Sequence, residues 1–165
     1  MRCPDISDGD GMRARSGFTL LELLIVCVVL IVVVALSAPA ISTALVRTKV
    51  SQAASLVAGD LSRAFTLAGR ARHPVRISFE SDSLRYRVVS LATGEVILDR
   101  RFGQESEYRL TEMEVSQDQI DIMPNGFVAI PGETEPMTSL VVRLAASGAS
   151  REIIMTRTGR IRVGG

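Results

Sequence analysis

A single glutamate, Glu22, stands at the start of the most apolar part of the chain. From Leu23 to Ile41, 19 residues carry no ionisable side chain except Cys27. That length is close to the roughly 20 residues that an α-helix needs to cross a bilayer. A carboxylate within hydrocarbon costs about 2.5–3.5 kcal/mol on insertion scales. The segment is therefore expected to form a long helix whose acid has a partner or a purpose.

A secretory signal peptide and a plain transmembrane anchor each explain only part of this apolar segment. A secretory signal peptide would use Arg13 and Arg15 as its charged region and Ala35-Leu36-Ser37 as its cleavage site. Against this, the apolar run exceeds the usual length of roughly 7–15 residues, and Pro39 closely follows the cut. A plain transmembrane anchor fits the length but leaves Glu22 unexplained.

The residues around the glutamate form a recognisable processing motif. The apolar run begins with Gly17-Phe18-Thr19-Leu20-Leu21-Glu22. This pattern resembles the class III signal of type IV pilins and type II secretion pseudopilins. The resemblance implies that a membrane-embedded prepilin peptidase cuts between Gly17 and Phe18 on the cytoplasmic side and then N-methylates Phe18. The leader would start at Met1 or Met12.

The same resemblance implies a purpose for the acid. In this family the glutamate at the fifth mature position, here Glu22, pairs with the N-terminal amine of a neighbouring subunit, which corresponds to Phe18 in this chain. Two buried charges offset much of each other's desolvation cost and fix the register between subunits. The alternative is a tolerated surface charge near the membrane interface.

The motif and the apolar run divide the N-terminal half of the chain. Residues 1–17 are expected to be the leader peptide, residues 18–41 a transmembrane helix and residues 42–72 an amphipathic continuation of that helix. Pro39 removes one backbone hydrogen bond and is expected to kink the helix without ending it.

The amphipathic part has one apolar face with helical spacing. Its members are Val46, Val50, Ala53, Ala54, Val57, Leu61, Ala64, Phe65 and Ala68. Polar side chains such as Arg47 and Arg63 take the other sides. The helix should end at Ala71, because Pro74 pushes the preceding His73 towards extended geometry. With no carboxylate or cysteine pattern nearby, His73 is expected to be structural or solvent-facing.

After Pro74 the apolar period changes from 3.6 to 2, which is typical of strands. Residues 73–165 are expected to form a periplasmic antiparallel β domain. Seven or eight strands are predicted, at residues 75–79, 84–88, 96–98, 108–110 or 113–115, 127–130, 139–144, 152–156 and 160–163. The predicted fold class is α+β, with a long N-terminal helix packed on a C-terminal antiparallel β-sheet domain.

A second resemblance narrows the family. The region after the helix resembles type II secretion system protein H (GspH) and the related FimT/FimU minor pilins. The resemblance is carried by the helix end, the Pro124-Asn125-Gly126 turn and the closing segment Arg151–Val163. Major pilins usually close a C-terminal loop with a disulfide, whereas this chain has no cysteine after Cys27. The resemblance therefore implies a minor pseudopilin or minor pilin.

The implied function is structural. The chain would be a single-pass inner-membrane protein, with a cytoplasmic N-terminus and a periplasmic C-terminal domain. It would join the periplasmic pseudopilus of the type II secretion system, near its tip, through helix contacts with other pseudopilins, and it would meet secreted substrates there. No cofactor, metal site or catalytic group is expected, because the chain has one histidine and no phosphate-binding glycine loop.

The alternative is a minor type IV pilin for pilus biogenesis or DNA uptake. Related competence pilins bind DNA through a C-terminal G-R-x-R, which matches Gly159–Arg162 here, and Arg157 stands just before it. Arg160 and Arg162 lie on one strand face by alternation and could contact phosphates. Alternatively, these charges protect a strand edge from aggregation. The net charge of +1 predicts no general nucleic-acid binder.

Overall fold

The computed structural model describes residues 18–133 and 137–164 of the 165-residue chain. The predicted leader, including Gly17, lies outside the described residues. The chain divides into two compact units, Met1–Pro39 and Ala40–Gly165. Every buried core residue lies at position 50 or later, so the second unit holds a complete hydrophobic core of its own.

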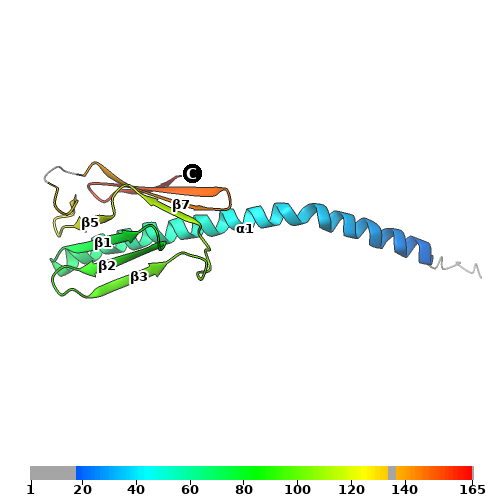
Figure 1. Ribbon diagram of the computed structural model, residues 1–165, viewed down its shortest axis with the longest axis horizontal. Coiled ribbons are helices and arrows are strands. Elements are labelled where there is room, and N and C mark those ends of the chain that lie inside the picture. The colour runs from blue at the N-terminus through cyan, green and yellow to red at the C-terminus, as the bar shows by residue number, and fades with distance from the viewer. Residues whose placement is uncertain (1–17, 134–136, 165) are drawn as a thin grey trace, which may run out of the picture. The chain divides into compact units, whose positions relative to one another are not determined.

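One helix, α1, runs from Leu20 to Ala71 (Figure 1). It ends where the sequence predicts. Arg72 follows the last helical residue with a φ of 57°, in the left-handed conformation that commonly terminates helices. The exposed His73 and then Pro74 lead the chain into the first strand. The expectation of a solvent-facing histidine is thus confirmed.

Among the residues that the structure describes, no helix combines the length and the apolar character that crossing a membrane requires. The transmembrane helix expected over residues 18–41 stays a prediction.

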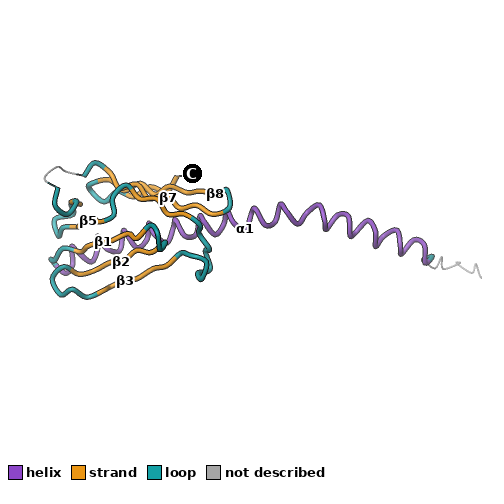
Figure 2. Tube along the Cα trace, viewed as in Figure 1, coloured by secondary structure: helices purple, strands orange, loops and turns teal. Residues whose placement is uncertain are grey.

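In the described residues, nine strands form two antiparallel sheets. Figures 1 and 2 show their arrangement around α1. The five-stranded sheet has the order β3-β2-β1-β5-β6 and the four-stranded sheet the order β4-β7-β8-β9. Their bounds are β1 Val75–Glu80, β2 Arg85–Ser90, β3 Val96–Arg101, β4 Glu112–Val115, β5 Gln119–Ile122, β6 Val128–Ala129, β7 Ser139–Ala146, β8 Ala149–Thr156 and β9 Ile161–Gly164.

The second half of α1 and both sheets share one core. Helix residues Val50, Val57 and Leu61 are buried in the same cluster as strand residues of the two sheets, among them Ile77 and Leu144. Of the nine helix positions expected to face the core, seven are buried, and Val46 and Phe65 are partly buried against it. The predicted α+β fold class is confirmed.

The strand predictions differ from the structure mainly in the middle of the domain. β4 matches the second of the two positions considered for a weak strand, and residues 108–110 form no strand. β5 was not predicted. Its four residues alternate polar and apolar side chains, but the run is short and follows a long polar stretch of the chain. Asp121 is nonetheless buried there, since it pairs with Arg76 of β1.

Candidate assembly sites

The first turn of α1 is closed by a side-chain cap. The Oγ1 of Thr19 accepts a hydrogen bond from the Glu22 N–H at 3.2 Å, and the Thr19 carbonyl accepts one from the Leu23 N–H at 3.2 Å. Thr19 is thus the N-cap and Glu22 the third helical residue, the arrangement of a capping box. The carboxylate also lies in the first turn, where the helix dipole favours negative charge.

Thr19 was not singled out from the sequence, although the signal was present. A threonine followed three residues later by a glutamate, just before an apolar run, marks a helix start. The hydrogen bond to Thr19 uses the backbone N–H of Glu22, so the local reason for an acid at position 22 is the helix dipole, which acts within a single chain. Pairing of Glu22 with a neighbouring subunit stays a prediction.

The other predicted N-terminal site residues are placed as follows. Phe18 immediately precedes the cap and is 76% exposed. α1 continues through position 39, so Pro39 does not end the helix, and a kink there stays a prediction.

Large apolar side chains are exposed along the first part of the helix, at Leu20, Leu21, Leu23, Leu24, Ile25, Val26, Val28, Val29, Leu30, Ile31, Val32, Val33 and Val34. A continuous apolar surface of this kind marks a contact with lipid or with another protein.

The three C-terminal arginines gather around the turn between β8 and β9. Arg157, Arg160 and Arg162 are all exposed. The guanidinium carbon of Arg157 lies 5.1 Å from the ring centroid of Phe127, which is itself 43% exposed. Phe127 lies 30 residues before Arg157 in the chain, so no local signal in the sequence places an aromatic ring beside these arginines.

The β8–β9 turn is held firmly in place. The Thr156 N–H donates to the Arg160 carbonyl at 2.9 Å, and the Gly159 N–H donates to the Thr156 carbonyl at 2.9 Å. Gly159 has a φ of +80°, and a Cβ atom added to it would lie 2.6 Å from the ring of Phe65 on α1. The turn therefore rests directly on the helix, at a position where only glycine fits without strain.

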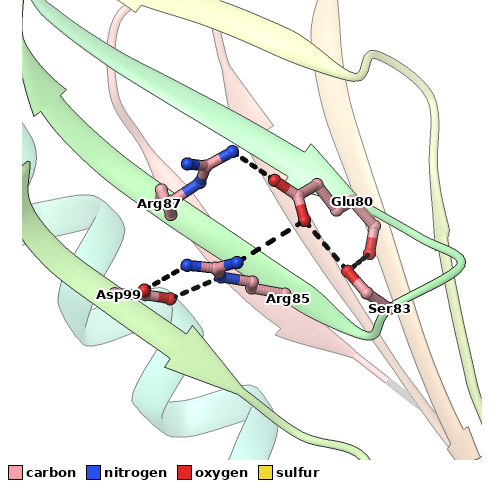
Figure 3. A network of polar contacts seen from close by, with 5 residues as sticks. All are labelled: Glu80, Ser83, Arg85, Arg87 and Asp99. Carbon is pink, nitrogen blue, oxygen red and sulfur yellow. Dashed lines mark hydrogen bonds and ion pairs between the residues drawn. The ribbon is translucent and has the colours of Figure 1, made fainter.

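Across the described part of the chain, none of these three arginines has a carboxylate within 4.0 Å. The arginines of the five-stranded sheet differ. On the face shown in Figure 3, Arg85 binds both oxygens of Asp99, one of them from Nε at 2.7 Å, and Arg87 binds Glu80. Ser83 also donates to Glu80 at 3.0 Å.

These contacts act on the acidity of the two carboxyls. Hydrogen bonds from Ser83 and Arg87 lower the pKa of Glu80, and the hydrogen bond from Arg85 lowers the pKa of Asp99. Both carboxylates are therefore held in their charged form, and the network neutralises most of the charge on this face.

A buried polar cluster joins α1 to the five-stranded sheet. Asp60, only 7% exposed, accepts hydrogen bonds from the Tyr86 hydroxyl at 2.6 Å and from Arg100 Nε at 3.1 Å. Burial, and then the hydrogen bond to Asp60, raise the pKa of Tyr86 far above its ordinary value. Asp60 was missed in the sequence, although it lies three residues after Val57 and so on the core-facing stripe.

In residues 18–133 and 137–164, no group of three or more His, Cys, Asp or Glu side chains could hold a metal ion. The surface grooves are lined mainly by polar residues. One of them is bordered by Arg85, Arg101 and the loop that follows β3.

Comparison with known proteins finds one sequence motif and two structures that are similar to this chain. Residues 12–38 match the model of the prokaryotic N-terminal methylation motif. Two crystal structures of the type IV minor pilin FimU from Pseudomonas aeruginosa are similar in fold. One has a TM-score of 0.56 at 17% identity, covering 72% of this chain and 90% of that one. The other has a TM-score of 0.52 at 17% identity, covering 70% and 92%. A search of curated proteins found no significant match.

Proposed function

We propose that this type IV pilin-like chain is a structural subunit of a pilus-like filament, in which it is a minor component. The observation that carries the proposal is the combination of an N-terminal methylation motif with a pilin fold. Processing by a prepilin peptidase between Gly17 and Phe18 and N-methylation of Phe18 belong to the proposal. The exposed apolar side chains of residues 20–34 would be covered by lipid before assembly and by neighbouring helices after it.

Within this class we favour a minor pseudopilin of the type II secretion system, placed near the tip of the periplasmic pseudopilus. The chain would sit in the inner membrane with its second unit in the periplasm. The support is the GspH-like closing segment and the lack of any cysteine after Cys27 with which a pilin disulfide could form. Such a subunit transmits force and needs no catalytic group of its own.

The second candidate is a minor type IV pilin, favoured by the fold similarity to FimU. DNA uptake is part of this candidate, since Arg157, Arg160 and Arg162 are exposed and unpaired among the described residues, and Phe127 adds a stackable ring beside them. DNA binding would weaken steeply with salt. A gel-shift titration of residues 40–165 at two salt concentrations measures it directly, and absence of salt-sensitive binding at micromolar protein eliminates DNA uptake.

A chromosomal deletion in the host separates the two candidates. Loss of folded exoproteins from the medium with normal surface pili supports the secretion pseudopilus. Loss of surface pili or of pilus-driven movement with normal secretion supports the minor pilin. A normal phenotype in both assays refutes the filament proposal. Complementation with Gly17→Arg then tests processing, because a large residue before the cut should leave an unprocessed, slower-migrating chain that restores neither phenotype.

The role of the Glu22 charge needs a variant of the same size and shape. Glu22→Gln removes the charge, and it keeps the backbone N–H that binds Thr19. If Glu22 pairs with the amine of a neighbour, then both Glu22→Gln and Glu22→Val should insert normally and fail to enter sheared filaments. Normal incorporation of Glu22→Gln would overturn the pairing role, because this variant has no charge to pair with the amine.

A further inference from the structure

The two edges of the four-stranded sheet carry opposite charges. At one edge, Glu112 and Glu114 of β4 are exposed and Met113 between them is buried. At the other edge, Arg160 and Arg162 are exposed on either side of the partly buried Ile161. In each case the charged side chains lie on the outer face of the sheet and the apolar side chain lies on the face towards the core.

Both edges also have backbone groups that point away from the sheet. The Thr156 N–H donates to the Arg160 carbonyl, so the alternation of an antiparallel ladder turns the N–H and C=O of Ile161 away from β8. At the other edge the Ser116 N–H donates to the Val141 carbonyl at 2.9 Å. By the same alternation, the N–H and C=O of Met113 point away from β7. Free edges of this kind are templates for strand pairing.

The strand order makes the two edges compatible. The sheet has four strands and each neighbouring pair is antiparallel, so β9 runs opposite to β4. A second copy placed alongside in the same orientation would therefore bring its β4 next to β9 as an antiparallel neighbour. Such a contact joins two different surfaces, and it fits neighbouring copies in a filament whose subunits all point the same way.

We propose that β9 of one copy pairs with β4 of a second copy, so that the four-stranded sheet continues from subunit to subunit. In the proposed register Arg162 lies opposite Glu112 and Arg160 opposite Glu114, which places Ile161 opposite Met113. The two residues of the central pair are those whose backbone groups are free, so they exchange hydrogen bonds, and both charge pairs lie on the outer face. Pairing of β9 with itself would instead bring arginines together.

The acidic edge is open to this contact. Glu112 and Glu114 are exposed, and a surface groove borders this edge and extends over the sheet as far as Arg143 of β7 and Glu152 of β8. Glu114 already lies 3.6 Å from Arg143, but both side chains are more than half exposed, and such pairs contribute little. The inference rests on the proposed function only in placing the contact inside a filament. The contact itself can be measured in solution between two copies of the fragment.

Cysteine pairing tests the register. Both native cysteines, Cys3 and Cys27, lie outside residues 40–165, so that fragment has none. Opposed residues in a non-hydrogen-bonded antiparallel pair have Cα atoms about 4.5 Å apart, within disulfide range. A mixture of Arg162→Cys and Glu112→Cys fragments should form disulfide-linked dimers at least tenfold faster than a control mixture of Arg162→Cys and Arg101→Cys, the latter on the edge of the other sheet. Equal rates overturn the proposal.

Charge exchange tests the chemistry independently. By sedimentation, Arg160→Glu/Arg162→Glu and Glu112→Lys/Glu114→Lys fragments should each lose self-association, and an equal mixture of the two should regain it. Failure of the mixture to associate, with both variants folded by circular dichroism, overturns the proposal. So does a wild-type fragment that stays monomeric at millimolar concentration while binding DNA through the same arginines, which would assign this edge to nucleic acid. Neither result bears on the secretion and piliation assays.

Discussion

Gly159→Ala is the substitution for which the structure gives the most definite consequence. Two separate penalties apply at this position. Alanine in the left-handed region costs about 1–2 kcal/mol. In addition, the new Cβ would lie 2.6 Å from Cε1 and 2.8 Å from Cζ of Phe65. Carbon atoms pack best at roughly 3.5–4.0 Å, so the ring or the turn must move by about 1 Å.

Overpacking of this size typically costs about 1–3 kcal/mol, because the neighbours are forced away from preferred rotamers. The sum predicts that Gly159→Ala lowers the free energy of unfolding by about 2–5 kcal/mol. Gly148→Ala is the matched control. Gly148 has a φ of +81° in the β7–β8 turn, but nothing lies within 4 Å of its added Cβ. That variant should lose only the conformational part, about 1–2 kcal/mol.

The assay is urea unfolding of residues 40–165, followed by circular dichroism, for both alanine variants. A third comparison places each change in a Phe65→Leu background, where the ring is gone. There, Gly159→Ala should lose no more stability than Gly148→Ala does, giving a coupling energy of about 1–3 kcal/mol between positions 65 and 159. Equal losses at Gly159 and Gly148 in the wild-type background would refute the contact between the turn and the helix.

Three further outcomes are expected. Asp60→Ala should lower the free energy of unfolding by about 1–3 kcal/mol, since it leaves the buried Tyr86 hydroxyl unpaired, and Asp60→Asn should lose less; urea titration measures both. The pKa values of Glu80 and Asp99 are lowered in the folded state, so the stability they contribute is present above their unfolded pKa values of about 4 and is lost as pH falls through the lower folded values. A Glu80→Gln/Asp99→Asn variant should therefore show a smaller drop in urea midpoint between pH 6 and pH 3. The pKa values of Tyr86 and Tyr108 are raised, so tyrosinate absorbance at 295 nm should appear at higher pH in the folded chain than in urea.

Local periodicity predicted most of the elements. The 3.6-residue apolar stripe predicted the buried face of α1, and Pro74 predicted its end at Ala71. Period-2 alternation predicted strands near β1, β2, β7, β8 and β9. These signals are local, because each depends only on which face of one element meets the core.

Pairing between distant residues was not predictable in this way. β5 is a short run of four residues, and its place in the sheet depends on pairing with β1, where Asp121 meets Arg76, 45 residues away. Phe127 meets Arg157 only once the two sheets are formed. At the candidate site, the sequence predicted the motif at Glu22 but not the cap by Thr19. Thr19 and Glu22 belong both to the processing motif and to a helix-start pattern, and only the processing motif was used for the prediction.

The Thr19 cap also bears on what removal of the leader does to the helix. Donor and acceptor, the Glu22 N–H and the Thr19 Oγ1, both lie on the mature side of the predicted cut, and α1 begins only at Leu20. The Thr19 cap would therefore remain after a cut before Phe18, and the terminal amine that the cut creates would directly precede a helix start held by residues of the mature chain.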